Sequence, residues 1–327
     1  MIQLFWRKLR SIGYLLTQES DPWRAIAQRA SENIRQAILA CKRGQPFTYT
    51  TQMGFPFVCL PQVETSKLLY IRQRAYEDVE LKLAQHWLQP GDTCLDLGAN
   101  VGYVTALLAH QVGHSGQVIA VEAAPQTVKH LELAKQLLKL PQVVVEPVCV
   151  TDADGAIAFM VSHNPGEDVR QSLTVSPELD GLFRAETVPS MTLNTLIERY
   201  RMQQAIALVK LDIEGAEPLA LKVASHLFQP DALPLFIVEI YKLGLARLGF
   251  APSDIWSLFS PDLFDLYVVN RSYPNPTPEI IPGVVYALPD PATHPWGWHT
   301  NLIAVPKVGR YGDRSAFKQL RSGAGGL

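Results

Sequence analysis

The chain has 327 residues, of which 47% are hydrophobic and 18% charged, and this composition excludes an intrinsically disordered protein. Its 29 Lys and Arg residues and 31 Asp and Glu residues leave a net charge of −2, which argues against a dedicated polyanion-binding protein. The apolar stretches are shorter than the roughly 18 residues that a membrane-spanning helix needs. We therefore expect no nucleic-acid partner and a globular fold.

The first 75 residues predict an extension that precedes the main domain. Residues 3–18 repeat apolar side chains at helical spacing and carry three basic residues, so they predict an amphipathic helix. Such a helix could lie on a membrane surface without stable insertion, but we favour docking on its own domain or on a second subunit, as a homodimer contact. The segment lacks the apolar run and cleavage site of a signal peptide, and we expect a cytoplasmic protein.

A second helix and a β-hairpin are expected within this extension. Asp21-Pro22 suits a helix start, and an apolar stripe runs from there to Cys41. Residues 46–60 predict two strands joined near Met53-Gly54. The four cysteines lie in apolar segments and form no CxxC pair, so we expect reduced core residues rather than zinc ligands.

Apolar strand-like runs alternate with helical patterns from residue 76 to residue 308. The strand-like runs are 93–97, 116–122, 142–150, 205–213, 233–240, 266–270 and 301–306. The helical patterns cover 76–88, 102–112, 125–140, 215–228 and 252–260, while 151–200 predict extra short strands and a loop. Strands that are apolar on both faces belong to parallel sheets covered by helices. The alternation therefore predicts an α/β domain over 76–308 with a doubly wound, mostly parallel sheet, followed by a flexible tail over 309–327.

The segment DTCLDLGANVGYVTALLA is the most informative in the chain. A buried strand that contains Asp96 runs into a turn with Gly98 and Gly102, and a helix begins directly afterwards. Glycines let backbone approach a ligand, and the free N–H groups of a helix start carry partial positive charge. Because ligands of open α/β sheets bind beyond the carboxyl ends of the strands, this turn is the predicted binding site.

The next strand ends in Glu122, and this acid indicates the kind of ligand. An acid at the end of the second strand typically accepts hydrogen bonds from the two hydroxyls of a ribose. A dinucleotide fingerprint that starts at Gly98 would need glycines where the chain has Asn100 and Tyr103. Asp96 would also repel a phosphate but would suit an amino group. S-adenosylmethionine, a nucleoside with an ammonium and no phosphate, fits these residues better than NAD does.

At this point the chain resembles a known family. DLGANVGYVTALLA, IAVEAAP and VKLDIEGAE together look like the FkbM family of S-adenosylmethionine-dependent methyltransferases, and the resemblance extends from Tyr76-Glu77 to residue 306. It implies a class I methyltransferase fold, with a seven-stranded Rossmann-like sheet whose last strand is antiparallel. It also implies methyl transfer to oxygen, often to a hydroxyl of a sugar or natural product.

The resemblance further implies which residues contact the cofactor. Those expected at its methionine end are Asp96, Gly98, Ala99, Asn100, Gly102 and Tyr103. Glu122 would hold the ribose, Ala123 would lie beside the adenine, and Cys149 and Val150 would border the adenine ring by their position after the third strand.

Acids close the fourth and fifth strands, where the acceptor is expected. Asp212 could hold the cofactor's amino group or take the proton of an acceptor hydroxyl, or it could cap the following helix. Glu239 would point into the same crevice, and Glu214 would share a face with Asp212 if the strand continued. Three acids could also hold a divalent cation, but the chain departs from the Asp-Asn pair of metal-dependent catechol-type methyltransferases, so we favour no metal.

His299 precedes the last strand and is a further candidate for the general base. The neighbouring Trp296 and Trp298 could stack on an acceptor ring or pack on the sheet edge. A polar loop over 162–172, which includes Asp168 and Arg170, could form a lid.

Three readings of the function follow from these residues. An O-methyltransferase that acts on a small-molecule hydroxyl is the leading one. A protein that binds the cofactor without turnover, as a scaffold or partner subunit, is the second. An N-methyltransferase for protein or nucleic acid is the third, although such enzymes commonly carry [DN]PP[YFW] after the fourth strand, where this chain has DIEG.

Overall fold

A computed structural model describes residues 22–73, 78–164, 166, 171–174, 181–202, 206–270, 279–282 and 299–312. Several sequence predictions lie outside these ranges: the helix over 3–18, Asp21, Tyr76-Glu77, Asp168, Arg170, Trp296, Trp298 and the tail beyond residue 312. In the described part of the chain, no helix is long and apolar enough to cross a membrane.

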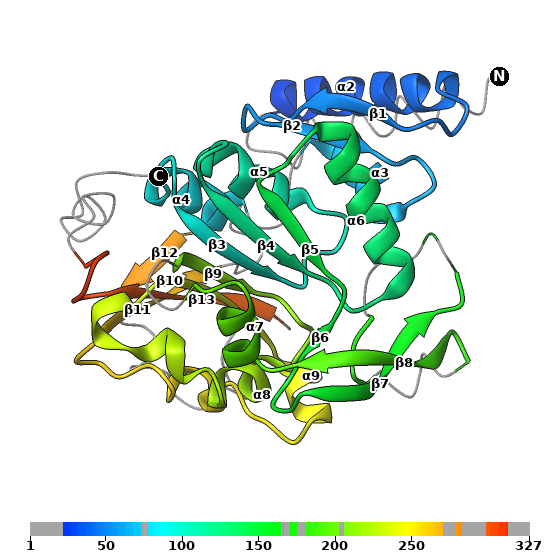
Figure 1. Cartoon of the computed structure of the whole chain (residues 1–327). Helices are drawn as coiled ribbons and strands as arrows, with labels where there is room; N and C mark the ends of the chain where they lie inside the picture. The colour runs from blue at the N-terminus through cyan, green and yellow to red at the C-terminus, as the bar shows by residue number, and fades with distance from the viewer. Residues whose placement is uncertain are drawn as a thin grey trace.

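A mixed sheet forms the centre of the molecule (Figure 1). Its strands lie in the order β12 (Glu279–Pro282), β11 (Phe264–Asn270), β13 (His299–Pro306), β10 (Leu235–Tyr241), β9 (Ile206–Leu211), β3 (Thr93–Leu97), β4 (Gln117–Val121) and β5 (Val143–Glu146). The strands from β10 to β5 are parallel, whereas β13 is antiparallel to both β10 and β11. The seven predicted strands and the antiparallel last strand are therefore confirmed, and the short β12 extends the sheet by pairing with β11.

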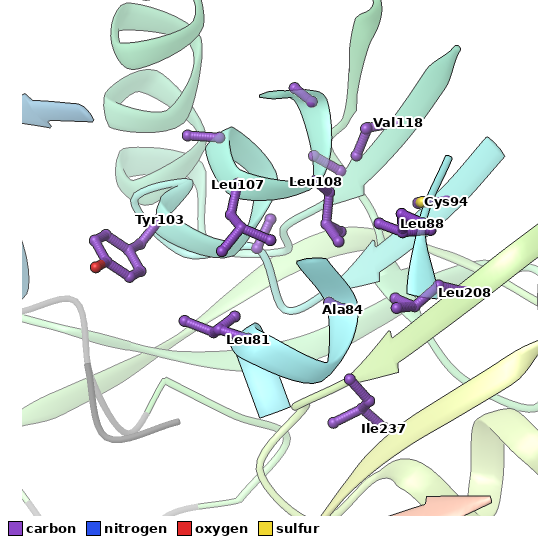
Figure 2. Close-up of a cluster of buried hydrophobic side chains, with 14 of the residues drawn as sticks. Leu81, Ala84, Leu88, Cys94, Tyr103, Leu107, Leu108, Val118, Leu208 and Ile237 are labelled. Carbon is purple, nitrogen blue, oxygen red and sulfur yellow. The ribbon is translucent and has the colours of Figure 1, made fainter. Parts of the chain in front are cut away.

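Helices cover both faces of this sheet, as the alternating pattern predicts. One face carries α4 (Asp78–Trp87), α5 (Tyr103–Val112) and α6 (Pro125–Leu138). The other carries α7 (Leu193–Arg199), α8 (Glu217–Lys222), α9 (Lys242–Arg247) and α10 (Ser253–Trp256), with short 3₁₀ turns at Ser225–Phe228 and Pro230–Ala232. Figure 2 shows Leu81 and Ala84 of α4 and Leu107 and Leu108 of α5 in one apolar cluster with strand residues such as Leu208. All six residues of β9 are buried, because this strand lies in the middle of the sheet between two helical layers.

The predicted hairpin is present and shares its core with the main domain. It consists of β1 (Phe47–Thr50) and β2 (Pro56–Cys59), followed by α3 (Glu64–Arg72). Phe55 and Phe57 are fully buried, and their rings meet the ring of Tyr103 edge-on at centroid distances of 5.1 and 5.0 Å. The hairpin thereby contacts the first residue of α5, directly after the turn that follows β3.

The second helix is α2 (Pro22–Cys41), which lies over the hairpin (Figure 1). From Ala30 onward, where the structure describes the side chains, its apolar stripe is exposed: Ile34 and Ile38 are 61% and 39% exposed. A homodimer contact through this region stays a prediction. Cys41 is also exposed, which corrects the expectation of four core cysteines, whereas Cys59, Cys94 and Cys149 are buried and free. The spacing of apolar residues predicts which face of a helix is apolar, but not whether another part of the chain covers that face.

The extra strands predicted for 151–200 are present, and they belong to a separate small sheet. Its strands are β6 (Cys149–Val150), β7 (Gly155–Ser162) and β8 (Phe183–Met191), with β8 between the other two. β7 and β8 make an antiparallel ribbon, seen at the lower right of Figure 1. Phe159 and Val161 of this ribbon pack with Ala124 and Cys149, so the ribbon touches the chain just after β4.

The strand order locates the candidate site. The chain runs outward from β3 through β4 to β5 and then returns to place β9 on the other side of β3. Such a reversal is a topological switch point, where the connections after neighbouring strands leave in opposite directions and open a crevice. The candidate site therefore lies beyond the carboxyl ends of β3, β4, β9 and β10.

Candidate functional site

Glu122 ties the turn after β3 to the end of β4. Its Oε2 accepts a hydrogen bond from the backbone N–H of Asn100 at 2.9 Å, and its Oε1 accepts one from the N–H of Ala124 at 2.9 Å. The N–H groups of Gly98 and Ala99 both donate to the carbonyl of Val121 at 2.9 Å. Each carboxylate oxygen can accept a second hydrogen bond, so Glu122, at 9% exposure, can still receive a ribose hydroxyl.

The glycines of this turn are required by the packing of the chain on itself. Gly98 has φ +81°, and a Cβ there would lie 1.8 Å from the carbonyl oxygen of Asp212. Gly102 has φ +85°, and its Cβ would lie 2.6 Å from a methyl group of Leu131. The N–H of Asp212 also donates to the carbonyl of Leu97 at 3.0 Å. The turns after β3 and β9 are thus in direct contact, which places the cofactor turn beside the candidate catalytic acid.

Asp96 lies beneath the turn with no exposed surface. Its Oδ2 accepts a hydrogen bond from the hydroxyl of Thr105 at 2.5 Å, while its Oδ1 receives none from any donor in the described ranges. Burial raises the pKa of Asp96, although the ammonium of Lys210 acts in the opposite direction. The prediction that Asp96 binds the cofactor's ammonium stays a prediction, and in this conformation such contact would require the turn to move.

The other predicted cofactor residues differ in exposure: some lie at the rim of the site and others are buried in the core. Gly98, Asn100 and Ala123 are partly exposed at the rim, where a ligand can touch them. Ala99, Gly102 and Tyr103 are buried, and the Tyr103 ring packs against the hairpin. A direct contact between Tyr103 and the cofactor stays a prediction; the structure gives this side chain a packing role.

On the adenine side, the structure brings Ala123 and Cys149 into one apolar cluster. Ala124, Phe159, Val161 and Leu173 belong to the same cluster. Val150 packs instead in the core on the opposite face of the sheet. The ribbon β7–β8 therefore supplies part of the apolar wall that we expected from Cys149 and Val150 together.

These features fit a nucleoside without phosphates. The cluster around Ala123 offers an apolar wall for an adenine ring, and Glu122 offers acceptors for ribose hydroxyls. The turn 98–102 contains no Lys or Arg, and the Glu122 carboxylate binds its backbone at Asn100, so the site lacks the positive side chains that a pyrophosphate would need.

Asp212 and Glu239 come together at the ends of β9 and β10. The Asp212 side chain is 29% exposed, and its Oδ2 accepts a hydrogen bond from the ammonium of Lys210 at 2.9 Å. Burial, together with the charges of Asp212, Glu214 and Glu217, raises the pKa of Glu239 well above its usual range. The raised pKa favours the protonated form of Glu239, while the ammonium of Lys210 favours the ionised form of Asp212.

The turn after β9 is built by Glu217 and does not need Asp212 as a cap. Glu217 Oε1 accepts hydrogen bonds from the N–H groups of Ile213 and Gly215 at 2.9 and 3.3 Å. Burial raises the pKa of Glu217 to about 8. The condition for Glu214 to share a face with Asp212 is not met, because β9 ends at Leu211 and Glu214 has φ +59°. Its charge nevertheless acts on Glu239.

β13 adds further polar residues beside Glu239. Asn301 lies opposite Glu239 in the register and donates to Glu80 Oε1 on α4 at 2.6 Å, and both residues are buried. His299, the predicted alternative base, lies opposite Tyr241 at the start of β13. Among the residues that the structure describes, no group of three His, Cys, Asp or Glu residues could hold a metal ion.

The comparisons with known proteins agree with this geometry. A model of the methyltransferase FkbM domain matches residues 96–264, which is just over half of the chain and runs from the end of β3 through β10. The chain belongs to the FkbM family of methyltransferases. Its cofactor is S-adenosylmethionine, as the residues around Glu122 suggest. A model of protein-L-isoaspartate(D-aspartate) O-methyltransferase also matches residues 22–162, which end before the turn after β9.

Individual relatives of this family member are distant. A protein-L-isoaspartate O-methyltransferase from Triticum aestivum is 42% identical over 48 residues, which cover 15% of this chain and only 21% of that protein. Solved structures include an O-methyltransferase from Thermotoga maritima, at 14% identity over 82% of this chain and 78% of that one, with a TM-score of 0.39. An FkbM methyltransferase from Methylobacillus flagellatus is 14% identical over 74% of this chain and 56% of that one, with a TM-score of 0.39. An rRNA methylase from Streptococcus thermophilus is 10% identical over 71% of this chain and 96% of that one, also with a TM-score of 0.39.

Sequence reasoning missed several residues of this site. Lys210 could have been noticed, because it is the charged residue in the otherwise apolar strand IALVKL. Thr105, Glu217 and Asn301 carry no such local signal, since their roles depend on which strand or turn they meet in the fold.

Proposed function

We propose that this methyltransferase transfers the methyl group to oxygen, on a hydroxyl of a sugar or natural-product-type small molecule. The observation that carries the proposal is the partly exposed Asp212 carboxylate, which is held by Lys210 at 2.9 Å directly beside the cofactor turn. An alcohol is a weak nucleophile until a base removes its proton, so an oxygen acceptor needs such a group within reach. When bound, S-adenosylmethionine supplies an electrophilic methyl group on a sulfonium.

Asp212 is the residue that takes the proton. Its carboxylate is partly exposed, and the ammonium of Lys210 stabilises its ionised form. A bound acceptor hydroxyl would pass its proton to Asp212, which would leave the oxygen able to take the methyl group that the cofactor supplies. Its position at the switch point lets the chain hold the acceptor in line with the methyl group, which can supply much of the rate.

The charge of the site favours a hydroxyl over a carboxylate as the acceptor. Asp212, Glu214 and Glu239 meet at this end of the sheet, and a substrate carboxylate would be repelled by the ionised ones. The isoaspartate methyltransferase match ends at residue 162, before any of these acids, so it bears on the cofactor half alone. Methylation of a protein carboxyl is therefore the weaker candidate.

Mass spectrometry tests the proposal directly. The full-length protein is incubated with S-adenosylmethionine and matched panels of sugars, phenols, other alcohols, carboxylic acids and amines, and each product is examined for a gain of about 14 Da. We expect the gain on a hydroxyl compound, with a loss of about 100-fold or more in Asp212→Asn. A gain confined to carboxylates or amines would refute the proposal. Binding of S-adenosylhomocysteine without transfer to any panel would favour the scaffold role.

A further inference from the structure

Lys210 is a buried cation in the centre of the sheet. It is 4% exposed and belongs to β9, whose other residues are apolar and buried. Burying an ammonium group costs free energy unless it is paired and hydrogen-bonded. Neither the family match nor the sequence analysis gives this residue a role, although the fold keeps it at the switch point.

The surroundings of Lys210 connect the two halves of the site. In the register, Lys210 lies between Asp96 on β3 and Ile237 on β10. Its ammonium donates to Asp212 Oδ2 at 2.9 Å, and its charge acts on Asp96. Asp212 follows directly after the end of β9, so the buried Lys210 ammonium reaches it from within the sheet.

Lys210 is too buried to touch an acceptor, whereas Asp212 is 29% exposed. One oxygen of Asp212 is therefore held by a buried cation. A carboxylate held in this way has little rotational freedom, which keeps its remaining acceptor positions directed toward the rim. An ammonium partner also favours the ionised form, the only form that can accept a proton.

We propose that Lys210 is a positioning residue for methyl transfer, which holds Asp212 in the orientation that lets it accept the acceptor's proton. This inference rests on the proposed function, because it assigns Lys210 to the hydroxyl-activating step. It predicts that the effect of Lys210 on turnover passes entirely through Asp212.

A double-mutant cycle on the full-length enzyme tests this. With the best hydroxyl acceptor, Lys210→Met should lower kcat by about 10-fold or more and change the acceptor KM by less than about 3-fold. Lys210→Arg, which keeps the charge, should retain more kcat than Lys210→Met. Adding Lys210→Met to Asp212→Asn should lower kcat by less than about 2-fold further, because the group being positioned is already lost. If Lys210 only packs, Lys210→Met should reduce the folded fraction, without a selective loss of kcat over KM and without non-additivity in the double mutant.

The matched control is Lys222→Met on α8, where the lysine is exposed and lies over the ring of Phe250. It should keep kcat within about 2-fold. Full kcat in Lys210→Met, or losses that multiply in the double mutant, would overturn the role of Lys210. Thermal unfolding and S-adenosylhomocysteine calorimetry of each variant show whether the fold and the cofactor site are intact. A wild type that binds S-adenosylhomocysteine but methylates no hydroxyl would overturn the proposed function instead.

Discussion

Asp212 and Glu239 lie near the ends of the neighbouring strands β9 and β10, and the charge of Asp212 acts on the Glu239 carboxyl. Burial and the neighbouring negative charges raise the pKa of Glu239 well above its usual range, so this carboxyl keeps its proton where an ordinary glutamate loses it. The ammonium of Lys210 favours the ionised form of Asp212, which stays available as a proton acceptor. The different roles of two acids of similar intrinsic pKa therefore come from the groups around them.

Glu239→Gln tests this division. The amide imitates the neutral, protonated acid in size and charge, so we expect kcat near neutral pH within about 5-fold of wild type, whereas Glu239→Ala should lose about 10-fold or more. In the wild type, a rise in pH removes the Glu239 proton and activity should fall on the alkaline side. In Glu239→Gln this fall should be absent, because the amide does not titrate. A pH–rate profile measures both effects, and an equally steep alkaline fall in the variant would contradict the assignment.

Glu122 should control cofactor affinity. Its two oxygens hold the N–H groups of Asn100 and Ala124 and can also receive ribose hydroxyls, so Glu122→Ala removes both functions. We expect S-adenosylhomocysteine to bind at least about 10-fold more weakly by calorimetry. Glu132→Ala on α6, where the glutamate is exposed, should bind within about 2-fold of wild type. Equal affinity in the Glu122 variant would remove this residue from the site.

Glu217 should make folding stability depend on pH. Its pKa is raised to about 8 in the folded protein, whereas in the unfolded chain it ionises near the usual value of about 4.3. Between these values the folded state binds a proton that the unfolded state has lost, so stability falls as pH rises. Glu217→Gln keeps an oxygen for the N–H groups of Ile213 and Gly215 but cannot titrate.

Urea unfolding between about pH 5 and pH 8 measures this effect. The wild type should lose more unfolding free energy across the range than Glu217→Gln does, by up to a few kcal/mol. The exposed-site variant Glu132→Gln should follow the wild type. Parallel curves for the wild type and Glu217→Gln would show that the Glu217 proton is bound equally in both states.

The hairpin should be required for the stability of the main domain. Phe57 is fully buried against Tyr103, so Phe57→Ala should cost about 3–5 kcal/mol of unfolding free energy. Phe47, which is only partly buried and meets Tyr70 in the extension itself, is the matched control and should cost clearly less as Phe47→Ala. Equal and small losses in denaturant unfolding would mean that the hairpin is a dispensable appendage.

The elements that local pattern determines were predictable from the sequence. The bounds of β3 agree with the predicted ones, and those of β9 and β10 agree within two residues. A short apolar run that is bounded by turn residues favours a buried strand over a helix. The location of the binding site was predictable from the same strands, because the carboxyl ends of parallel strands lie at one edge of the sheet. The helix α9 and the length of the β7–β8 ribbon were missed, because both depend on contacts made after folding.

What local pattern could not give was the packing of distant residues. Gly98 looked like a glycine for ligand approach, but the structure shows that the carbonyl of Asp212, far along the chain, occupies the space of its missing side chain. Asp96 looked accessible from its place at a strand end, yet Thr105 and the turn above it cover it completely. Val150 was assigned to the adenine wall by its position, but alternation along β6 sends only Cys149 to that side.

The central claim is that a phosphate-free nucleoside cofactor binds beyond the ends of β3 and β4, and isothermal titration of the wild type with S-adenosylhomocysteine and with NAD tests it most directly. We expect a dissociation constant in the micromolar range for S-adenosylhomocysteine and no detectable binding of NAD. Binding of NAD without binding of S-adenosylhomocysteine would contradict it.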